Sequence, residues 1–231
     1  MNDNTKSMIV VGIVLLLILI PFIYVIISLK NTNNSINGHP ISGSDTDSKM
    51  MNNMHGNQQT SDDGLNKDIQ EIKFRDAVGK KAPDFILKNQ DGGTFKLSDN
   101  IGKKDIILFF NEGAMCYPAC WQQIAALGKD ERLNNENVVS VSVLVDPKEK
   151  WTQVINSEPA FQKSTMLFDT AQRVSNAYDV LNLESSMHKG SYPGHTYFII
   201  NKEGIIIYKL DDPNMALNNE LLVSKLNELG A

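Results

Sequence analysis

The chain has 231 residues, of which 42% are hydrophobic and 21% are charged, and its formal net charge is −5 at pH 7. A negative chain without a stripe of lysine and arginine argues against a nucleic-acid partner, because binding requires cations that neutralise phosphates. Its two cysteines are too few for a scaffold held by several disulfides or for a cysteine-only zinc site. A redox pair, two ligands for a soft metal, or two unrelated buried thiols remain possible.

The first predicted element is a membrane anchor. After a short N-terminal flank at residues 1–7, residues 8–29 form an uncharged apolar run. As a helix rising about 1.5 Å per residue, this run can cross a hydrocarbon layer about 30 Å thick. It is longer than the apolar region of about 7–15 residues in a signal peptide, and no small-residue cleavage site follows it. The sequence therefore predicts an uncleaved transmembrane helix in the cell membrane, with a cleaved signal peptide as the alternative.

The next segment, residues 30–67, is rich in Asn, Ser, Gly, Asp and Met. Such a composition buries too little apolar surface to offset the entropy of ordering, so it predicts a disordered linker. The linker contains KMMNNMHG, in which three methionines and His55 are side chains of the kind that bind copper. A solvated linker that happens to contain methionines is the favoured interpretation of this stretch.

Residues 68–231 have the pattern of a globular domain. Short apolar runs indicate buried strands, and stretches with helical periodicity lie between them. In chain order we expect a hairpin turning at 91–93, a strand at 106–110, a helix at 117–128, a strand at 138–145, a helix at 148–157, a strand at 165–169, a helix at 171–181, two strands within 195–210 joined by a turn at 202–204, and a helix at 218–229. This alternation predicts an α/β domain with a mixed central sheet.

Both cysteines lie in GAMCYPACWQ, residues 113–122, directly after the apolar run IILFF. Cys116 is expected at or beside the N-cap of the helix, where free N–H groups and the helix dipole lower the pKa of a thiol. Cys120 shares a helical face with Ile124 and Leu127, so it is expected to point inward. Cys116 is then the exposed nucleophile and Cys120 its shielded partner. Four residues of helix separate their Cα atoms by about 6 Å, which permits a disulfide.

At this point the sequence resembles the alkyl hydroperoxide reductase/thiol-specific antioxidant family of peroxiredoxin-like redoxins. The stretch VGKKAPDFILKNQDGGTFKLSD, residues 78–99, is similar to the opening of that family, and LFDTAQRVSNAYDV and HTYFIINKEGII resemble two later segments. The matching positions in the first stretch are Gly79, Ala82, Pro83, Phe85, Asp91, Gly92, Leu97, Ser98 and Asp99. The resemblance covers about residues 76–229. It implies a thioredoxin-like fold, with helices on both faces of the mixed sheet, and thiol redox chemistry.

The chain departs from this family at the residues that polarise peroxide. Family peroxidases carry Pro-x-x-x-Thr/Ser-x-x-Cys, but here Phe109 and Gly113 occupy the proline and threonine positions. The later arginine of the family falls near His195. Glu112 and His195 are therefore candidates to take over the missing roles. A thioredoxin-type disulfide reductase would instead need C-x-x-C and a cis-proline, whose position is also held by His195.

A third resemblance is to Sco-type copper-delivery proteins, which share the fold, a membrane anchor, C-x-x-x-C and a later histidine. In that alternative Cys116, Cys120 and His195 would bind Cu(I), since two thiolates and an imidazole suit that ion. The chain lacks the Sco motif itself. Pro193 lies where the Sco histidine is expected, and Tyr117 replaces the proline that follows the first Sco cysteine.

These observations predict a membrane-tethered thiol-dependent oxidoreductase that needs no cofactor. Its predicted site comprises Cys116, Cys120, His195 and Glu112, with Cys116 attacking a peroxide or a protein disulfide and Cys120 resolving the intermediate. A reducing thiol protein would return the pair to its thiol form. The tether and the habit of the family favour an extracytoplasmic domain. The copper-binding chaperone and a redoxin retained only as a binding module remain as alternatives.

Overall fold

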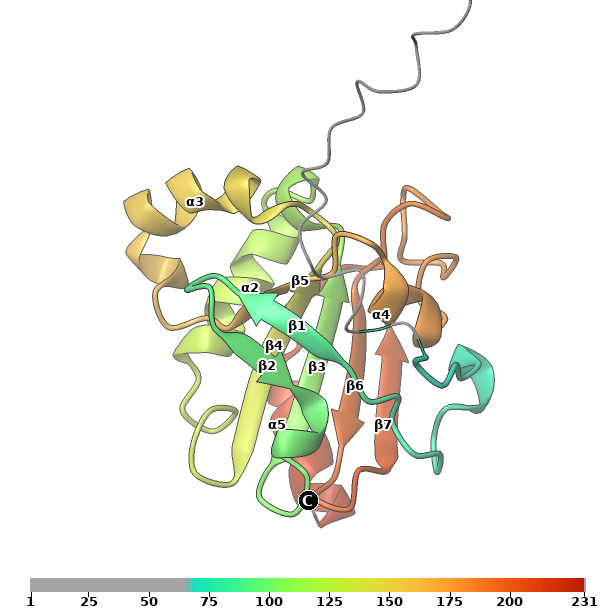
Figure 1. The fold of residues 1–231 in the computed structure, drawn as a ribbon. Coiled ribbons are helices and arrows are strands. Elements are labelled where there is room, and N and C mark those ends of the chain that lie inside the picture. The colour runs from blue at the N-terminus through green and yellow to red at the C-terminus, as the bar shows by residue number, and fades with distance from the viewer. Residues whose placement is uncertain (1–65, 67, 231) are drawn as a thin grey trace, which may run out of the picture. The chain divides into compact units, whose positions relative to one another are not determined.

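The computed structural model describes residues 66 and 68–230 of the chain (Figure 1). The predicted anchor at 8–29, and the predicted linker apart from Asn66, lie outside these residues. Among the helices of the described part, none has both the length and the apolar character required to cross a membrane. Asn66 is buried, and its side-chain amide accepts a hydrogen bond from the Ile86 N–H at 3.0 Å and donates one to the Ile86 carbonyl at 2.7 Å.

A seven-stranded sheet forms the centre of the domain, with the order β2-β1-β5-β4-β3-β6-β7. Its strands are β1 (Ile86–Asn89), β2 (Thr94–Lys96), β3 (Asp105–Asn111), β4 (Val138–Leu144), β5 (Met166–Phe168), β6 (Thr196–Ile200) and β7 (Ile206–Asp211). The β3–β4 and β4–β5 pairs are parallel, and all the other pairs are antiparallel. The mixed sheet predicted from the sequence is therefore confirmed.

Strand β3 lies near the middle of this sheet and leads directly to the cysteines. All seven of its residues are buried, which explains why its sequence is almost continuously apolar rather than alternating. It pairs in parallel with β4 and antiparallel with β6, so that Phe109 lies opposite Tyr197 and Phe110 opposite Thr196. This register brings the residues that follow β3 close to those that precede β6.

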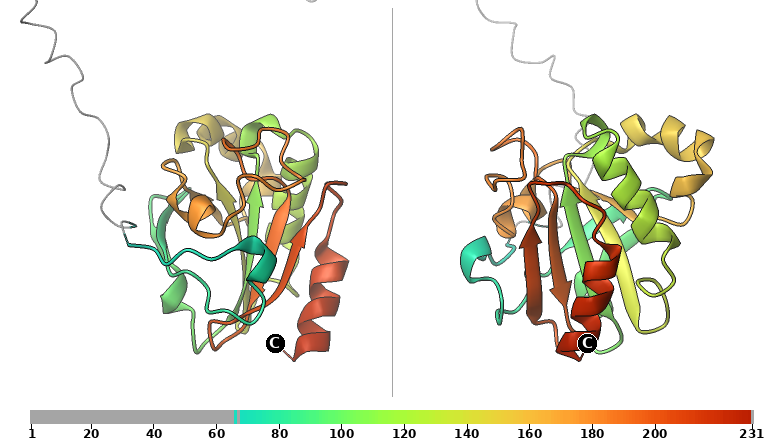
Figure 2. Two further views of the ribbon diagram at one scale, coloured as in Figure 1. Left: turned by 90° about the vertical axis from the view of Figure 1, so that its right-hand side faces the viewer. Right: turned by 180° about the vertical axis from the view of Figure 1, so that it is seen from behind.

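Helices cover both faces of the sheet, as predicted (Figure 2). They are α2 (Ala119–Lys129), α3 (Lys148–Ser157), α4 (Arg173–Ala177) and α5 (Asn219–Leu229), and short 3-10 turns, η1 to η4, occur at Phe74–Asp76, Leu97–Asp99, Gly113–Met115 and Pro159–Phe161. Ile124 of α2, Trp151 of α3 and Leu222 of α5 share one core cluster with Phe109. Val174 of α4 packs on the opposite side with Phe110.

One of the predicted helices is much shorter in the structure. The helix expected at 171–181 is reduced to the five residues of α4, because Gln172 and Asp179 on either side both have φ of 57°, in the left-handed region that interrupts a right-handed helix. The other predicted strands and helices agree with the structure to within two residues at either end.

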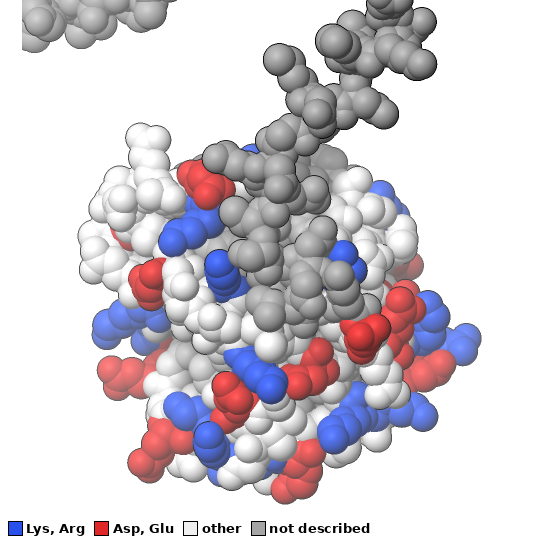
Figure 3. Space-filling view, viewed as in Figure 1, with Lys and Arg blue, Asp and Glu red and all other residues white. Residues whose placement is uncertain are grey.

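Charged side chains of both signs are interspersed over the face of the domain that Figure 3 shows. Several form exposed ion pairs, such as Arg75 with Asp76 and Lys73 with Asp179. Exposed pairs of this kind contribute little to stability. The expectation that the protein has no nucleic-acid partner stays a prediction.

Candidate active site

The two cysteines form a disulfide at the carboxyl end of β3. After β3 the chain passes through Glu112 and the 3-10 turn η3 to Cys116, and α2 begins three residues later with Cys120 in its first turn. The Cα atoms of the two cysteines are 5.3 Å apart, and the Cys120 N–H donates to the Cys116 carbonyl at 3.0 Å. The predicted pairing of these two residues is present in the structure, and Cys120 is fully buried as expected.

Cys116 lies beside the start of the helix, as predicted: it shortly precedes Pro118, which is the N-cap residue, and the Tyr117–Pro118 peptide bond is cis. It differs from its prediction in exposure, since only 3% of its surface is accessible in the disulfide form. The flanking side chains of Met115 and Tyr117 are exposed, at 46% and 72%. Cys116 is therefore a covered sulfur between two exposed neighbours.

Glu112 is buried and joins the end of β3 to a distant loop. Its carboxylate oxygen Oε1 accepts hydrogen bonds from the backbone N–H groups of Met187 at 2.5 Å and His188 at 3.1 Å. The other oxygen, Oε2, lies 3.5 Å from Nδ1 of His188, whose side chain is half-exposed. Glu112 is thus a buried group near the cysteines and not an exposed loop carboxylate. The carboxylate fixes residues 186–188 beside the cysteine loop.

The threonine position of the family cannot accept a side chain in this protein. Gly113 has φ of +67°, and a Cβ atom at this residue would lie 1.9 Å from Oδ2 of Asp146. That carboxylate oxygen accepts a hydrogen bond from the Ala114 N–H at 2.7 Å and one from Nε1 of Trp151 at 3.3 Å. The carboxylate of Asp146 therefore occupies the space where the threonine side chain would lie, and its hydrogen bond to Ala114 fixes the loop before Cys116.

His195 lies at the start of β6, on the same face of the sheet as α2. Its ring contacts the ring of Phe109, with centroids 4.7 Å apart, and its Nε2 lies 2.9 Å from the hydroxyl of Tyr197. Nδ1 is buried without a hydrogen-bond partner. Burial lowers the pKa of His195 from 6.5 to about 4, although the nearby charge of Asp212 opposes this. His195 is thus neutral at pH 7, and it cannot lower the pKa of Cys116 by acting as a cation there.

The depressed pKa of His195 predicts a loss of stability in acid. The unfolded chain binds a proton near pH 6.5 but the folded protein only near pH 4. The stabilisation is therefore complete above pH 6.5 and is lost as the pH falls toward 4. Between pH 7 and pH 4.5, the unfolding free energy of the wild type should fall by about 2–3 kcal/mol more than that of His195→Asn. Urea denaturation of both proteins measures this difference.

Measuring the unfolding free energies of wild type and His195→Asn at pH 7 and at pH 4.5 isolates the contribution of His195. Burial also raises the pKa of Asp169, to about 6, and that group stabilises the fold in the opposite direction, at low pH. Because Asp169 is present in wild type and variant alike, its contribution cancels in the difference. An equal pH dependence of wild type and His195→Asn would contradict the assignment.

The copper alternative needs Cys116, Cys120 and His195 to converge on one ion. In residues 66 and 68–230, no group of three or more His, Cys, Asp or Glu side chains has an arrangement suited to a metal ion. The sulfurs of the two cysteines are bonded to each other, and His195 directs Nε2 to Tyr197. The three side chains thus lie in one region of the fold without forming a ligand set.

Two residues of this region were not found by sequence reasoning. Asp146 follows the buried strand β4 with only Val145 between them, so its place at the carboxyl edge of the sheet was a usable signal. Met215 lies in the loop between β7 and α5, and its Sδ is 3.9 Å from Sγ of Cys116. Nothing in the sequence around Met215 indicates this contact, which joins residues 99 apart.

Comparison with known proteins places the site in a family. The family model described as "AhpC/TSA family" matches residues 78–209, more than half of the chain. The chain belongs to the AhpC/TSA family. Its AhpC/TSA domain contains the whole segment from the end of β3 to Cys120, and also His195. The match agrees with the first resemblance drawn from the sequence and does not favour the Sco-type alternative.

Curated relatives of the AhpC/TSA domain are peroxiredoxins. Peroxiredoxin Bcp of Bacillus subtilis (strain 168) is 32% identical over 133 residues, which cover 56% of this chain and 82% of the relative. Peroxiredoxin Bcp of Escherichia coli (strain K12) is 28% identical over 154 residues, which cover 65% of this chain and 96% of the relative. With this family membership, the protein is a thiol-dependent oxidoreductase of the peroxiredoxin type, and the prediction of an enzyme is confirmed.

A solved structure similar to this domain is the reduced 2-Cys peroxiredoxin of Plasmodium vivax. Its TM-score is 0.58 at 23% sequence identity, and the match covers 67% of this chain and 82% of that chain. At this identity the similarity concerns the fold alone. It confirms the thioredoxin-like α/β architecture that the resemblance implied.

Proposed function

We propose that this protein reduces hydroperoxides with Cys116 as the nucleophile and Cys120 as the resolving cysteine. The observation that carries the proposal is the disulfide between them at the carboxyl end of β3. The Cys116 thiolate attacks the terminal peroxide oxygen; an S–O bond forms, the O–O bond breaks, and the leaving alkoxide takes up a proton. The Cys120 thiol then condenses with the Cys116 sulfenic acid and releases water. A dithiol protein reduces the resulting disulfide.

The contacts of Glu112 and the burial of His195 suit both residues to supporting roles in this mechanism. Glu112 accepts hydrogen bonds from the backbone N–H groups of residues 187 and 188, and these bonds fix that segment beside the cysteine loop. His195 is neutral at pH 7 because burial lowers its pKa to about 4. It can donate or accept a hydrogen bond in the buried region behind α2. The direct participation of His195 and Glu112 in the reaction stays a prediction.

The proposal is tested by adding one equivalent of hydrogen peroxide to the fully reduced protein and following the mass of the peptide that spans both cysteines. We expect the two thiols to be converted to a disulfide, with a loss of two hydrogens, faster than in a free dithiol peptide of the same sequence. Turnover should then require a dithiol reductant. A reaction no faster than that of the peptide would contradict peroxidase activity.

One observation favours thiol–disulfide exchange as a second candidate function. The threonine position that would polarise peroxide is Gly113, which has no space for a side chain beside Asp146. A protein disulfide needs no such polarising group, because the Cys116 thiolate can attack its sulfur directly. If the same experiment gives slow oxidation by peroxide but fast oxidation by a model disulfide, exchange is the better assignment.

We also propose that residues 8–29 anchor the protein in the cell membrane, with the redoxin domain on the extracytoplasmic side. The support for this is the uncharged apolar run in the sequence, which is long enough to span a bilayer. Fractionation of cells that express the full chain tests it. Recovery of the protein in the soluble fraction would contradict the anchor.

A further inference from the structure

A hydrogen-bonded turn connects β7 to α5 beside the disulfide. The buried carboxylate of Asp212 organises it: Oδ1 accepts from the Asn214 N–H at 3.0 Å, and Oδ2 accepts from the Ala216 N–H at 2.9 Å and from Nδ2 of Asn218 at 2.8 Å. Hydrogen bonds to a carboxylate are among the stronger ones in proteins. The path of the chain between residues 212 and 218 is therefore well determined.

Met215 occupies the middle of this turn and covers Cys116. Its backbone has φ of +50°, a conformation that residues other than glycine adopt only when the surrounding structure imposes it. Its N–H donates to the Asp212 carbonyl at 3.1 Å, and its Sδ lies 3.9 Å from Sγ of Cys116. The turn thus presents one half-buried thioether to the sulfur of the nucleophile.

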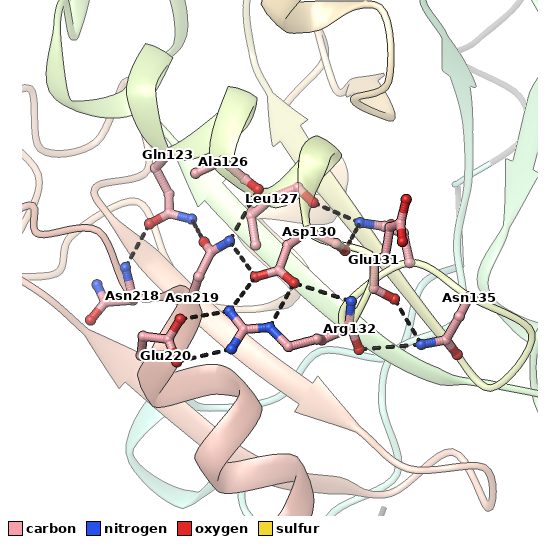
Figure 4. A network of polar contacts seen from close by, with 11 residues as sticks. Gln123, Ala126, Leu127, Asp130, Glu131, Arg132, Asn135, Asn218, Asn219 and Glu220 are labelled. Atoms are coloured by element: carbon pink, nitrogen blue, oxygen red, sulfur yellow. Dashed lines mark hydrogen bonds and ion pairs between the residues drawn. The ribbon is translucent and has the colours of Figure 1, made fainter.

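A polar network fixes the turn relative to the helix that carries Cys120 (Figure 4). The Asn218 N–H donates to Oε1 of Gln123 at 2.8 Å, and Nε2 of Gln123 donates to Oδ1 of Asn219 at 2.8 Å. Gln123 lies one helical turn beyond Cys120 on α2. Neither cysteine takes part in these hydrogen bonds, so cleavage of the S–S bond removes no donor or acceptor from them.

A second part of the network holds the other end of α2 against the start of α5. Asn219 donates through Nδ2 to Asp130 at 3.0 Å, and Arg132 bridges Asp130 and Glu220 with contacts of 2.8 and 2.6 Å. These contacts join the C-terminal end of α2 to the N-terminal end of α5. Met215 and Cys120 are consequently carried by one connected unit.

We propose that Met215 is a positioning residue that shields the Cys116 sulfenic acid from a second peroxide until Cys120 condenses with it. This inference rests on the proposed peroxidase function. The competing step transfers one more peroxide oxygen to the sulfenic acid, which yields a sulfinic acid and releases an alcohol. A thioether has no proton to donate and presents an apolar, polarisable surface, so it excludes water and peroxide without reacting as an acid or base.

The test compares wild type, Met215→Ala, Met215→Leu and the control Leu217→Ala, whose side chain is exposed in the same turn. Each reduced protein is treated with increasing hydrogen peroxide, and peptide mass spectrometry gives the ratio of sulfinic acid at Cys116 to disulfide. We expect Met215→Ala to raise this ratio at least about threefold, because the open sulfur meets a second peroxide more often. Met215→Leu, which keeps the apolar bulk, and Leu217→Ala should stay near the wild-type ratio.

The variants separate shielding from a general effect on the fold. Peptide mapping distinguishes oxygen added to Cys116 from oxygen added to methionines, and melting temperatures report any loss of stability. An unchanged ratio in Met215→Ala, or an equal increase in Met215→Leu, would overturn the inference while leaving the peroxidase function intact. A wild-type protein that forms no disulfide with peroxide would overturn both.

Discussion

Replacing Cys116 with serine is expected to abolish peroxide-dependent turnover, whereas replacing Cys120 with serine should preserve the first oxidation and prevent its resolution. The two cysteines differ in position. Cys116 lies at the end of the loop that begins at Glu112 and is hydrogen-bonded to Asp146, whereas Cys120 is fully buried in the first turn of α2. Loss of a nucleophile typically reduces turnover by several orders of magnitude, and we expect at least about 10³-fold here.

The two serine variants differ in the products they accumulate. In Cys120→Ser, one equivalent of peroxide should leave Cys116 as a sulfenic acid, and excess peroxide should carry it to the sulfinic acid. In Cys116→Ser, the thiol of Cys120 should remain unmodified. Mass spectrometry of the cysteine peptide measures both outcomes. Peroxide consumption by Cys116→Ser at the wild-type rate would reverse the assignment of the two cysteines.

Gly113→Thr, which restores the residue found in family peroxidases, is expected to destabilise the protein instead of improving it. The new Cβ would lie 1.9 Å from Oδ2 of Asp146 at a backbone φ of +67°. Left-handed backbone at a side chain with Cβ and an overpacked contact together cost about 2–5 kcal/mol. For a domain of this size, the melting temperature should fall by on the order of 10 °C.

A second glycine provides the matched control for this variant. Gly102 has a similar φ of +80°, but a Cβ atom there would meet nothing within 4 Å. Gly102→Thr therefore introduces the backbone strain without the clash, and it should lose only about 1–2 kcal/mol. If both variants melt at the same temperature, the proximity of Asp146 has no energetic consequence, and the explanation given for the missing threonine is wrong.

Sequence reasoning succeeded where local pattern determines the outcome. The apolar run of β3 and the position of the cysteines immediately after it were sufficient to predict the strand, the following helix and a cysteine pair within bonding distance. The spacing of Cys120 from Ile124 and Leu127 was enough to predict its burial. These inferences use the periods of strands and helices, which depend on neighbours in the chain.

Prediction from the sequence failed where segments that are distant in the chain contact each other. The contact of Cys116 with Met215 joins residues 99 apart, and the turn that carries Met215 has no recognisable motif. The neutral state of His195 follows from its burial, which lowers its pKa, and the periodicity of the sequence gives no measure of that burial. The short extent of α4 depends on the left-handed φ of Gln172 and Asp179, and the helical periodicity of this stretch gives no indication of that conformation.

The carboxylate of Asp146 connects helix α3 to the loop that leads to Cys116. It accepts a hydrogen bond from the cysteine loop at Ala114 and another from the indole of Trp151, and its other oxygen pairs with Lys150. The position of α3 is therefore coupled to the geometry of the nucleophile. In a genetic screen for peroxide sensitivity, alleles at Trp151 would be grouped with alleles at Cys116, although the indole is fully buried in the core and touches no substrate.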